Sequence, residues 1–333
     1  GMPDPYITRL ENDIQTNDRF PSLASGIGLN HQVAVVWPRY RLNVDQDPIY
    51  NLMLAVLNPD LESPVVMLPL QITTNSVPYT TAGGVWMQDA GAFWVGTDKV
   101  WIIWKEQQFI SPTETTTNIR AGLYNLSTKK WVPDELPQFL KTGTTEVYYS
   151  DPTLIGLEDG TVLVFFSEIR EDLKTQQIYW ALLGTTGQIV KQPAALVGLQ
   201  GGSQDAALVG EKLLLTWVTP DRGAVAYNLI SLSGSGSTLS LLLGTTQLLV
   251  LENHNLVEHI TLFADQQQNG ILTWKNVDHT QMYYALVSSD GKLQTPAVMF
   301  FRDPSAGIMV SKNGQSSTLY TGAYRLSLPF LSK

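Results

Sequence analysis

Short apolar runs separated by turn residues dominate the chain, and helical spacing of apolar residues is nearly absent. The clearest stretch is Ser150–Gly187, which holds three such runs, Asp151–Leu157, Thr161–Phe166 and Gln177–Leu183, and leads into a fourth, Gln188–Leu196. Apolar runs of this length bounded by Gly, Asp, Ser and Thr are typical of β-strands. Four consecutive short strands predict one antiparallel blade of a β-propeller.

Weaker copies of this unit recur along the whole chain, and the second predicted strand of each copy ends in an aromatic residue. The six aromatic residues are Trp37, Trp104, Phe166, Trp217, Trp274 and Tyr320. Their spacing is unequal, as loop insertions between repeats would make it. Third strands are predicted after them at Tyr50–Leu57, Ile119–Leu126, Gln177–Leu183, Ala224–Leu232 and Gln281–Val287.

The repeats predict an all-β fold, a six-bladed β-propeller with four-stranded antiparallel blades that forms a single domain over residues 1–333. Blades are expected to start near residues 22, 89, 151, 205, 259 and 305. The sixth copy is too short to supply four strands, so residues 1–18, with the strand-like Tyr6–Leu10, are predicted to complete the last blade. Such closure protects sheet edges. A β-sandwich with accidental spacing is the alternative.

Polar residues occupy matching places at the starts of the predicted first strands. They are Ser22, Asp89, Asp151, Asp205, His259 and Ser305, which lie fifteen residues before the aromatic residue in five copies and twelve before it in the fourth. Because first strands line the channel of a propeller, we expect a ring of these side chains at one mouth. Three carboxylates and an imidazole could bind a polyol or a cation such as calcium. Capping of neighbouring backbone groups is the alternative role.

Four further residues stand three positions before ring residues: Arg19 and Arg302 in the first and sixth copies, and Trp86 and Tyr148 in the second and third. The two arginines belong to copies that are neighbours across the closure, so both guanidinium groups could face one anion. An aromatic ring beside an arginine would suit a sugar. The candidate ligand-binding set is therefore Arg19, Trp86, Asp89, Tyr148, Asp151, Asp205, His259 and Arg302, with no catalytic residue assigned.

The segment RFPSL followed by VAVVWPRYR resembles the opening of sialidase-type propellers, in which an Arg-x-Pro motif precedes the first inner strand. The resemblance implies six blades, an arginine triad for a substrate carboxylate, a Tyr/Glu nucleophile pair and an Asp acid. The aspartate-box repeat of that family is not intact, and Ser288–Gly291 keeps only part of it. Arg222, in a loop after a second strand, is the remaining candidate for a third arginine.

Composition narrows the possible partners. A net charge of −9 without a Lys-Arg cluster argues against nucleic acid. The chain has no cysteine, so it has no disulfide and no thiolate ligand.

No apolar run has the length of a membrane helix, and the first residues lack the pattern of a signal peptide. Sparse charge, 15% of residues, favours an extracellular or cell-surface protein.

The sequence favours a binding module for a glycan or a protein partner at the channel mouth, because the polar positions align without a complete catalytic set. A divergent glycoside hydrolase of sialidase-like descent is the alternative, with Arg19 and Arg302 as anion clamps and an Asp as acid. A purely structural scaffold is the third. No cofactor is expected, apart from the channel cation left open above.

Overall fold

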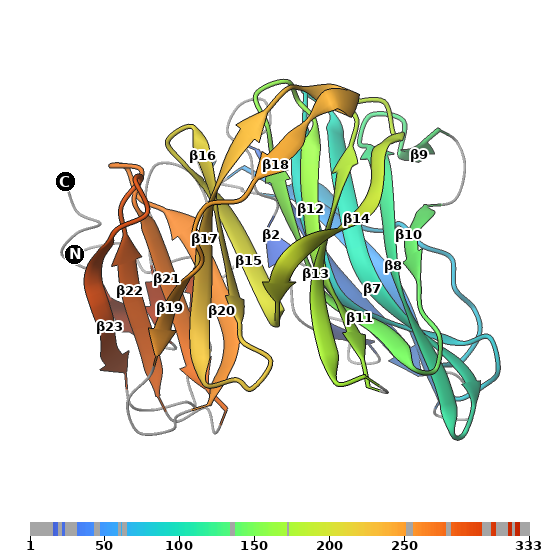
Figure 1. The fold of residues 1–333 in the computed structure, drawn as a ribbon. Helices are drawn as coiled ribbons and strands as arrows, with labels where there is room; N and C mark the ends of the chain where they lie inside the picture. The colour runs from blue at the N-terminus through green and yellow to red at the C-terminus, as the bar shows by residue number, and fades with distance from the viewer. Residues whose placement is uncertain are drawn as a thin grey trace.

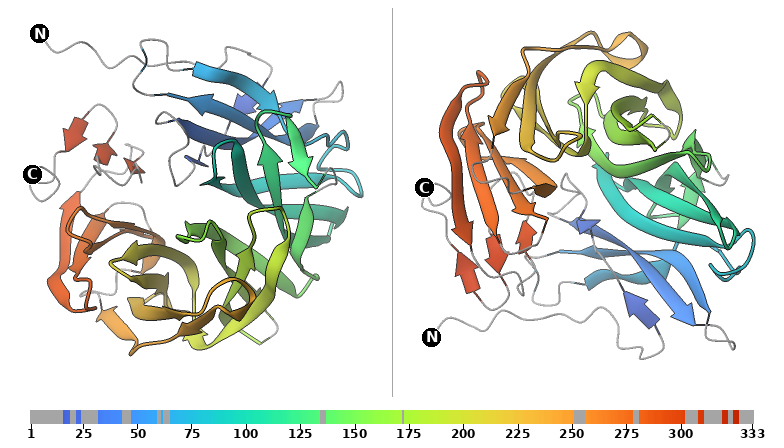
Figure 2. Two further views of the ribbon diagram at one scale, coloured as in Figure 1. Left: turned by 90° about the horizontal axis from the view of Figure 1, so that it is seen from above. Right: turned by 60° about the horizontal axis from the view of Figure 1, so that its bottom comes forward.

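The computed structural model describes residues 16–18, 22–23, 32–42, 47–58, 61, 65–133, 137–171, 173–250, 256–277, 281–301, 308–310, 319–321 and 324–326. The regular elements in these ranges are β-strands and one short 3-10 turn, η2 (Gly236–Thr238). No helix among them is long and apolar enough to cross a membrane. The strands form six antiparallel sheets in chain order, and Figure 2 shows these sheets arranged around a common centre.

Each sheet is built by a contiguous stretch of chain. The first strands are β2 (Ser22–Leu23), β6 (Val85–Val95), β11 (Val147–Gly156), β15 (Gly202–Val209), β20 (Val257–Ala264) and β24 (Ile308–Val310). The second strands are β3 (Val33–Leu42), β7 (Lys99–Ser111), β12 (Val162–Arg170), β16 (Lys212–Val218), β21 (Gly270–Asn276) and β25 (Leu319–Thr321).

The remaining strands complete the sheets outward. The third strands are β4 (Pro48–Leu57), β8 (Glu114–Asn125), β13 (Thr175–Leu183), β17 (Ala224–Ser233), β22 (Met282–Val287) and β26 (Tyr324–Leu326). The outer strands are β5 (Val65–Gln71), β9 (Lys130–Val132) with β10 (Gln138–Thr142), β14 (Ile189–Gln200), β18 (Ser240–Leu242) with β19 (Gln247–Val250), and β23 (Leu293–Phe301).

This is the predicted fold, a six-bladed β-propeller, and we number its blades 1 to 6 in chain order. Within a blade each strand pairs with the next, as in β11-β12-β13-β14, and the blades stand side by side in Figure 1. The first strands β2, β6, β11, β15 and β20 contact one another in succession. They therefore line the centre, as the sequence predicted.

Some strands are interrupted, and the N-terminal segment is described only at its end. The outer strands of blades 2 and 4 are split in two, and both halves pair with the same third strand. At the end of segment 1–18, β1 (Thr16–Asp18) pairs with β3 in blade 1 and not with blade 6. Blade 6 has three strands among the described residues. Tyr6–Leu10 lies outside those residues, so closure of the last blade by this strand stays a prediction.

The hydrophobic core lies between the blades. Four clusters of buried side chains each join two neighbouring sheets: blades 1 and 2, 2 and 3, 3 and 4, and 4 and 5. Trp37, Trp104, Phe166, Trp217 and Trp274 are at most 3% exposed. The repeated aromatic residue is therefore a packing residue, because burying such a ring between sheets removes a large apolar area from water.

The innermost strands approach one another closely enough to restrict side-chain size. A Cβ atom on Gly156 of β11 would lie 1.7 Å from the ring of Phe93 in β6. Real Cβ atoms do not come so near, so β6 and β11 can pack at this distance only with a glycine at this position.

Candidate functional site

Four neighbouring blades carry a β-bulge near the start of the innermost strand. The register shifts between Gln88 and Gly91, between Ser150 and Thr153, between Gly202 and Asp205, and between Glu258 and Ile260. In blades 2, 3 and 4 the extra residues lie opposite the repeated aromatic residue on the neighbouring second strand, and in blade 5 the extra residue lies directly before the partner of Trp274. A bulge at such a place turns side chains out of the regular alternation of the strand, and bulges are over-represented next to active sites.

The backbone at these bulges is unusual. Asp89, Ser203 and His259 have φ angles of 46°, 48° and 47°, the left-handed region that residues other than glycine rarely adopt. Asp151 lies in the matching bulge of blade 3, directly before Pro152. These four residues are structurally equivalent, and they lie at one end of strands that run in the same direction around the centre.

This equivalence corrects the expected ring in blade 4. The matching residue there is Ser203, fourteen residues before Trp217, and Asp205 lies two positions further along β15. The register differs because the turn between β15 and β16 is short: Val209 already pairs with Lys212. A search for acidic residues selects Asp205, but the bulge identifies Ser203.

Asp205 is buried, with 7% of its surface exposed, and it holds three blades together. Its Oδ1 atom accepts hydrogen bonds from the Thr153 hydroxyl at 2.8 Å and the Ala206 N–H at 2.9 Å. Its Oδ2 atom accepts from the Leu262 N–H at 2.8 Å. The carboxylate therefore links β11, β15 and β20.

The side chains of Asp89 and His259 are both open to solvent. The Asp89 side chain is 38% exposed, and its Oδ2 atom forms an ion pair with Lys105 of β7. The His259 imidazole is 64% exposed, and its Nε2 atom is 4.0 Å from Oε1 of Glu258. Both groups can exchange hydrogen bonds with a ligand.

Tyr148 and Trp86, which precede the bulges in blades 3 and 2, are both half-buried. Burial raises the pKa of Tyr148; the charge of Glu171 raises this pKa further, and the charge of Arg222 lowers it. The Arg222 carbonyl accepts the Val257 N–H at 2.8 Å, so its loop reaches the start of β20. The mouth thus combines the phenol of Tyr148 with charges of both signs.

Ser22 lies in β2, which pairs with β3. Arg19, Arg302 and Ser305 lie outside the described residues, so the expected arginine clamp stays a prediction. Among the residues that the structure describes, no three Asp, Glu or His side chains come together in a group that could hold a metal ion. The candidate residues are spread around the mouth. Asp89 lies in blade 2 and His259 lies in blade 5.

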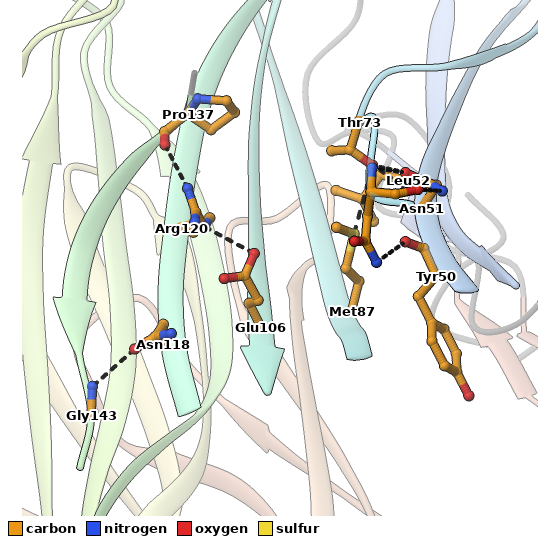
Figure 3. Close-up of polar contacts among 11 residues, drawn as sticks. Tyr50, Asn51, Leu52, Thr73, Met87, Glu106, Asn118, Arg120, Pro137 and Gly143 are labelled. Carbon is orange, nitrogen blue, oxygen red and sulfur yellow. Dashed lines mark hydrogen bonds and ion pairs between the residues drawn. The ribbon is translucent and has the colours of Figure 1, made fainter. Parts of the chain in front are cut away.

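Two further carboxylates, Glu168 and Glu106, lie near the bulges, two residues beyond the repeated aromatic residue of their strands. The Tyr149 hydroxyl donates to Glu168 Oε2 at 3.1 Å, and burial together with the Glu168 charge raises the pKa of Tyr149. In blade 2 the equivalent carboxylate, Glu106, is 5% exposed and lies 2.9 Å from Arg120 Nε (Figure 3). Arg120 also donates to the Pro137 carbonyl at 3.1 Å.

A repeated amide side chain near the start of the third strand went unnoticed in the sequence. Asn51, Asn118, Gln177 and Gln281 occupy the same place, two residues before the partner of the repeated aromatic residue. Figure 3 shows Asn118 accepting the Gly143 N–H, at 3.1 Å, and Asn51 beside Thr73. Gln177 donates to the carbonyls of Leu196 and Leu199 at 2.8 and 3.0 Å. Asn51, Asn118 and Gln177 thus hold the outer strand, or the connection that leads from it into the next blade. The Gln281 side chain accepts a hydrogen bond from the Tyr283 hydroxyl.

No family model and no curated protein matches the chain. Solved structures match over almost its full length. An α-L-arabinanase of Penicillium chrysogenum complexed with arabinobiose is 10% identical with a TM-score of 0.50, and the match covers 91% of this chain and 88% of the arabinanase. This likeness supports the propeller fold that the sheets define.

Two other propeller structures match at lower scores. A subtype N10 neuraminidase-like protein of the isolate A/little yellow-shouldered bat/Guatemala/060/2010 is 8% identical with a TM-score of 0.49, and the match covers 93% of this chain and 91% of that one. The fungal lectin of Aleuria aurantia, described as a six-bladed β-propeller that recognises fucose, is 11% identical with a TM-score of 0.43. That match covers 91% of this chain and 88% of the lectin.

Proposed function

We propose that the protein is a binding module that recognises a glycan at the mouth of its central channel. The observation that carries the proposal is the set of matching bulges, which place Asp89, Asp151, Ser203 and His259 at one end of the innermost strands. A left-handed backbone at a residue other than glycine costs about 1 kcal/mol or more, and such strain concentrates at functional sites.

The chemistry of the mouth suits sugar hydroxyl groups. The half-exposed carboxylate of Asp89 accepts hydrogen bonds, the exposed imidazole of His259 both donates and accepts, and the Tyr148 hydroxyl does the same. A sugar presents donors and acceptors around its whole ring, so contacts from several blades can each take part. The buried carboxylate of Asp205 supports this arrangement, because it fixes the relative positions of β11, β15 and β20.

Binding to a glycan array tests the proposal, together with electrophoresis in gels that contain soluble arabinan, xylan, β-glucan or galactan. We expect Asp89→Asn to weaken binding about tenfold, because a hydrogen bond to a charged group is lost. Asp290→Asn is the matched control, since Asp290 also pairs with a lysine, Lys292, but lies at the opposite end of its blade. His259→Gly should also weaken binding while it relieves the left-handed backbone.

The second candidate is a sialidase-like glycoside hydrolase, and the hydrogen bond between Tyr149 and Glu168 favours it, because that family uses a Tyr/Glu nucleophile pair. Two observations oppose this role: Tyr149 is 3% exposed, and its pKa is raised where a nucleophile needs a lowered one. A panel of aryl-glycosides, sialosides included, separates the candidates. Turnover that Asp89→Asn or Asp151→Asn abolishes would establish the hydrolase, and glycan binding without turnover would support the module.

A further inference from the structure

Five aromatic rings form a continuous strip across the seam between blades 1 and 2. They are Tyr40 of β3, Tyr50 of β4, Tyr79 of the connection between β5 and β6, Trp86 of β6 and Phe109 of β7. Successive ring centroids lie 5.4 Å apart for Tyr40 and Tyr50, 6.0 Å for Tyr50 and Trp86, 5.8 Å for Trp86 and Tyr79, and 6.1 Å for Tyr79 and Phe109. We call these five residues the aromatic strip.

The aromatic strip lies at the mouth end of the two blades. Tyr40 pairs with Tyr50 three residues beyond Trp37, and Trp86 pairs with Gln107 three residues beyond Trp104. Second strands end, and first and third strands begin, at the end where the bulges lie. Trp86 is only three residues from Asp89 on the same strand, so the strip continues outward from the ring of bulge residues.

The rings of the strip differ from the packing aromatics of the core. Trp37 and Trp104 are 3% and 1% exposed, whereas all five strip residues are half-buried and keep part of their surface in solvent. Three of the five carry a phenol, and burial raises the pKa of Tyr79, which keeps this phenol protonated. The strip therefore offers partly exposed aromatic surface that carries three phenol hydroxyl groups.

The connection that carries Tyr79 is held in place from several sides. The Asn51 side chain accepts the Asn75 N–H at 2.7 Å and donates to the Asn75 carbonyl at 3.0 Å. The Tyr79 N–H donates to the Pro48 carbonyl at 2.9 Å. Figure 3 shows the Tyr50 ring extending away from these hydrogen bonds. The strip is thus fixed before any ligand arrives, which lowers the entropic cost of binding.

A close turn completes this support. Gly83 N–H donates to the Phe109 carbonyl at 3.0 Å, and Phe109 N–H donates to the Gly84 carbonyl at 2.9 Å. A Cβ atom on Gly84 would lie 1.9 Å from the Pro78 carbonyl oxygen, so the turn needs glycine there. The chain has thus built a specific local structure that brings Tyr79 between Trp86 and Phe109.

We propose that the aromatic strip is a sugar-stacking subsite, so that the ligand of the mouth is a linear oligosaccharide that runs outward over blades 1 and 2. The inference rests on the proposed function and extends it from a single sugar to a chain. The C–H faces of sugar rings stack on Trp86, Tyr79 and their neighbours, and the hydroxyl groups reach Asp89.

A proline-rich peptide is the other ligand that aromatic grooves commonly bind. Its backbone offers carbonyl acceptors but few donors, and the carboxylate of Asp89 needs donors. Sugar hydroxyl groups supply them. The continuity of the strip with Asp89 therefore favours a glycan.

The test uses oligosaccharides of increasing length, prepared from whichever of arabinan, xylan, β-glucan or galactan retards the protein in native gels, with calorimetry as the readout. For the wild type, affinity should rise with chain length. Trp86→Leu and Tyr79→Leu should remove this rise and weaken binding of the longest chain about tenfold, and in Tyr79→Leu the shortest chain should bind as before. Phe139→Leu is the control, because Phe139 is a 47% exposed ring on the outer strand β10.

The outcomes separate the two proposals. If Asp89→Asn weakens binding but the affinities of Trp86→Leu and Tyr79→Leu match the wild type at every length, the strip is a packing seam and the mouth site stands. If the wild type binds none of the four polysaccharides and no glycan on the array, both proposals fail. If a proline-rich peptide binds and Trp86→Leu abolishes that binding, the strip is a peptide groove and the glycan assignment is wrong.

Discussion

Asp205 shows that the same residue type can serve two purposes in a repeated fold. Asp89 and Asp205 both lie near the start of an innermost strand, but the first is half-exposed at a bulge and the second is buried. The offset of two positions from Ser203 to Asp205 makes the difference, because it places the carboxylate among N–H and O–H donors of three blades. Burying a charge is costly unless hydrogen bonds surround it, and here three do.

Asp205→Ala should therefore destabilise the protein strongly. The change leaves the Leu262 N–H without its acceptor, so we expect a loss of about 2–4 kcal/mol in the free energy of unfolding. Urea unfolding followed by tryptophan fluorescence measures it. Asp221→Ala is the control: Asp221 is exposed and bonds only within its own turn, to Thr219 and Gly223. Equal losses in the two variants would show that the Asp205 carboxylate does not hold the three blades together.

Tyr149 gives a prediction for alkaline pH. Its pKa is raised in the folded protein, so its contribution to stability is complete below the unfolded value of about 10 and is lost as pH rises above that value. Thermal unfolding recorded from pH 8 upward should show a fall in melting temperature above about pH 10. Tyr149→Phe should melt lower at neutral pH, since Glu168 loses a donor, but should fall less steeply in alkali. If the melting temperature of Tyr149→Phe falls with pH as steeply as that of the wild type, the loss of stability in alkali comes from other tyrosines.

At the scale of elements, the strands were predictable because their signals are local. The predicted third strands Ala224–Leu232 and Gln281–Val287 agree with β17 and β22 within a residue, since apolar runs and turn residues define both ends. The innermost strands carry bulges that depend on the register with a neighbour, and no local pattern reveals that register. This is why the distance to Trp104 places Asp89 correctly, whereas the sequence alone points to Asp205 in blade 4 and not to Ser203.

The amide side chains that hold the inter-blade connections escaped notice for the same reason. Asn51 and Asn118 look like ordinary polar residues at the starts of strands, and their partners lie more than twenty residues away. An alignment of the third strands detects their equivalence, because the same position holds Asn in two copies and Gln in two others. The fourth copy has Ala224 instead, and there the Thr219 hydroxyl bonds to the Ala224 backbone.

Replacing Asn51 should loosen one connection more than the blades beside it. Asn51→Ala removes acceptors of the Asn75 N–H and the Thr73 hydroxyl, and a donor to the Asn75 carbonyl. We expect a loss of about 2–4 kcal/mol in stability, because these groups are partly buried. Hydrogen exchange should speed up at residues 72–79 first. Gln71→Ala, which removes one exposed hydrogen bond to the same segment, should cost about 1 kcal/mol or less. Unchanged exchange in Asn51→Ala would show that the amide does not fix the connection.

At the scale of the whole molecule, both faces of blade 1 are buried, as a closed ring of sheets requires. Its two faces bury alternating residues: Ala34, Val36 and Leu54 pack toward blade 2, whereas Val35, Trp37 and Met53 form a separate cluster on the other face. Trp37 and Met53 are 3% and 5% exposed, so that second face is covered as well. In a closed ring the sheet that covers it is the last blade, and the seam between the last and first blades then contributes to the core.

Removal of residues 1–18 should open this seam. The truncated chain loses β1 from blade 1 and, if Tyr6–Leu10 completes blade 6, the strand that covers its outer edge. We expect the melting temperature to fall by about 5–10 °C. Removal of residues 1–15 separates the two contributions, because it spares the pairing of β1 with β3. If this shorter truncation melts like the wild type, residues 1–15 add no stabilising strand and the predicted closure is wrong. A fall close to that of the longer truncation places the stabilising strand among residues 1–15, because strand pairing at an open sheet edge is what a propeller must supply to complete its ring.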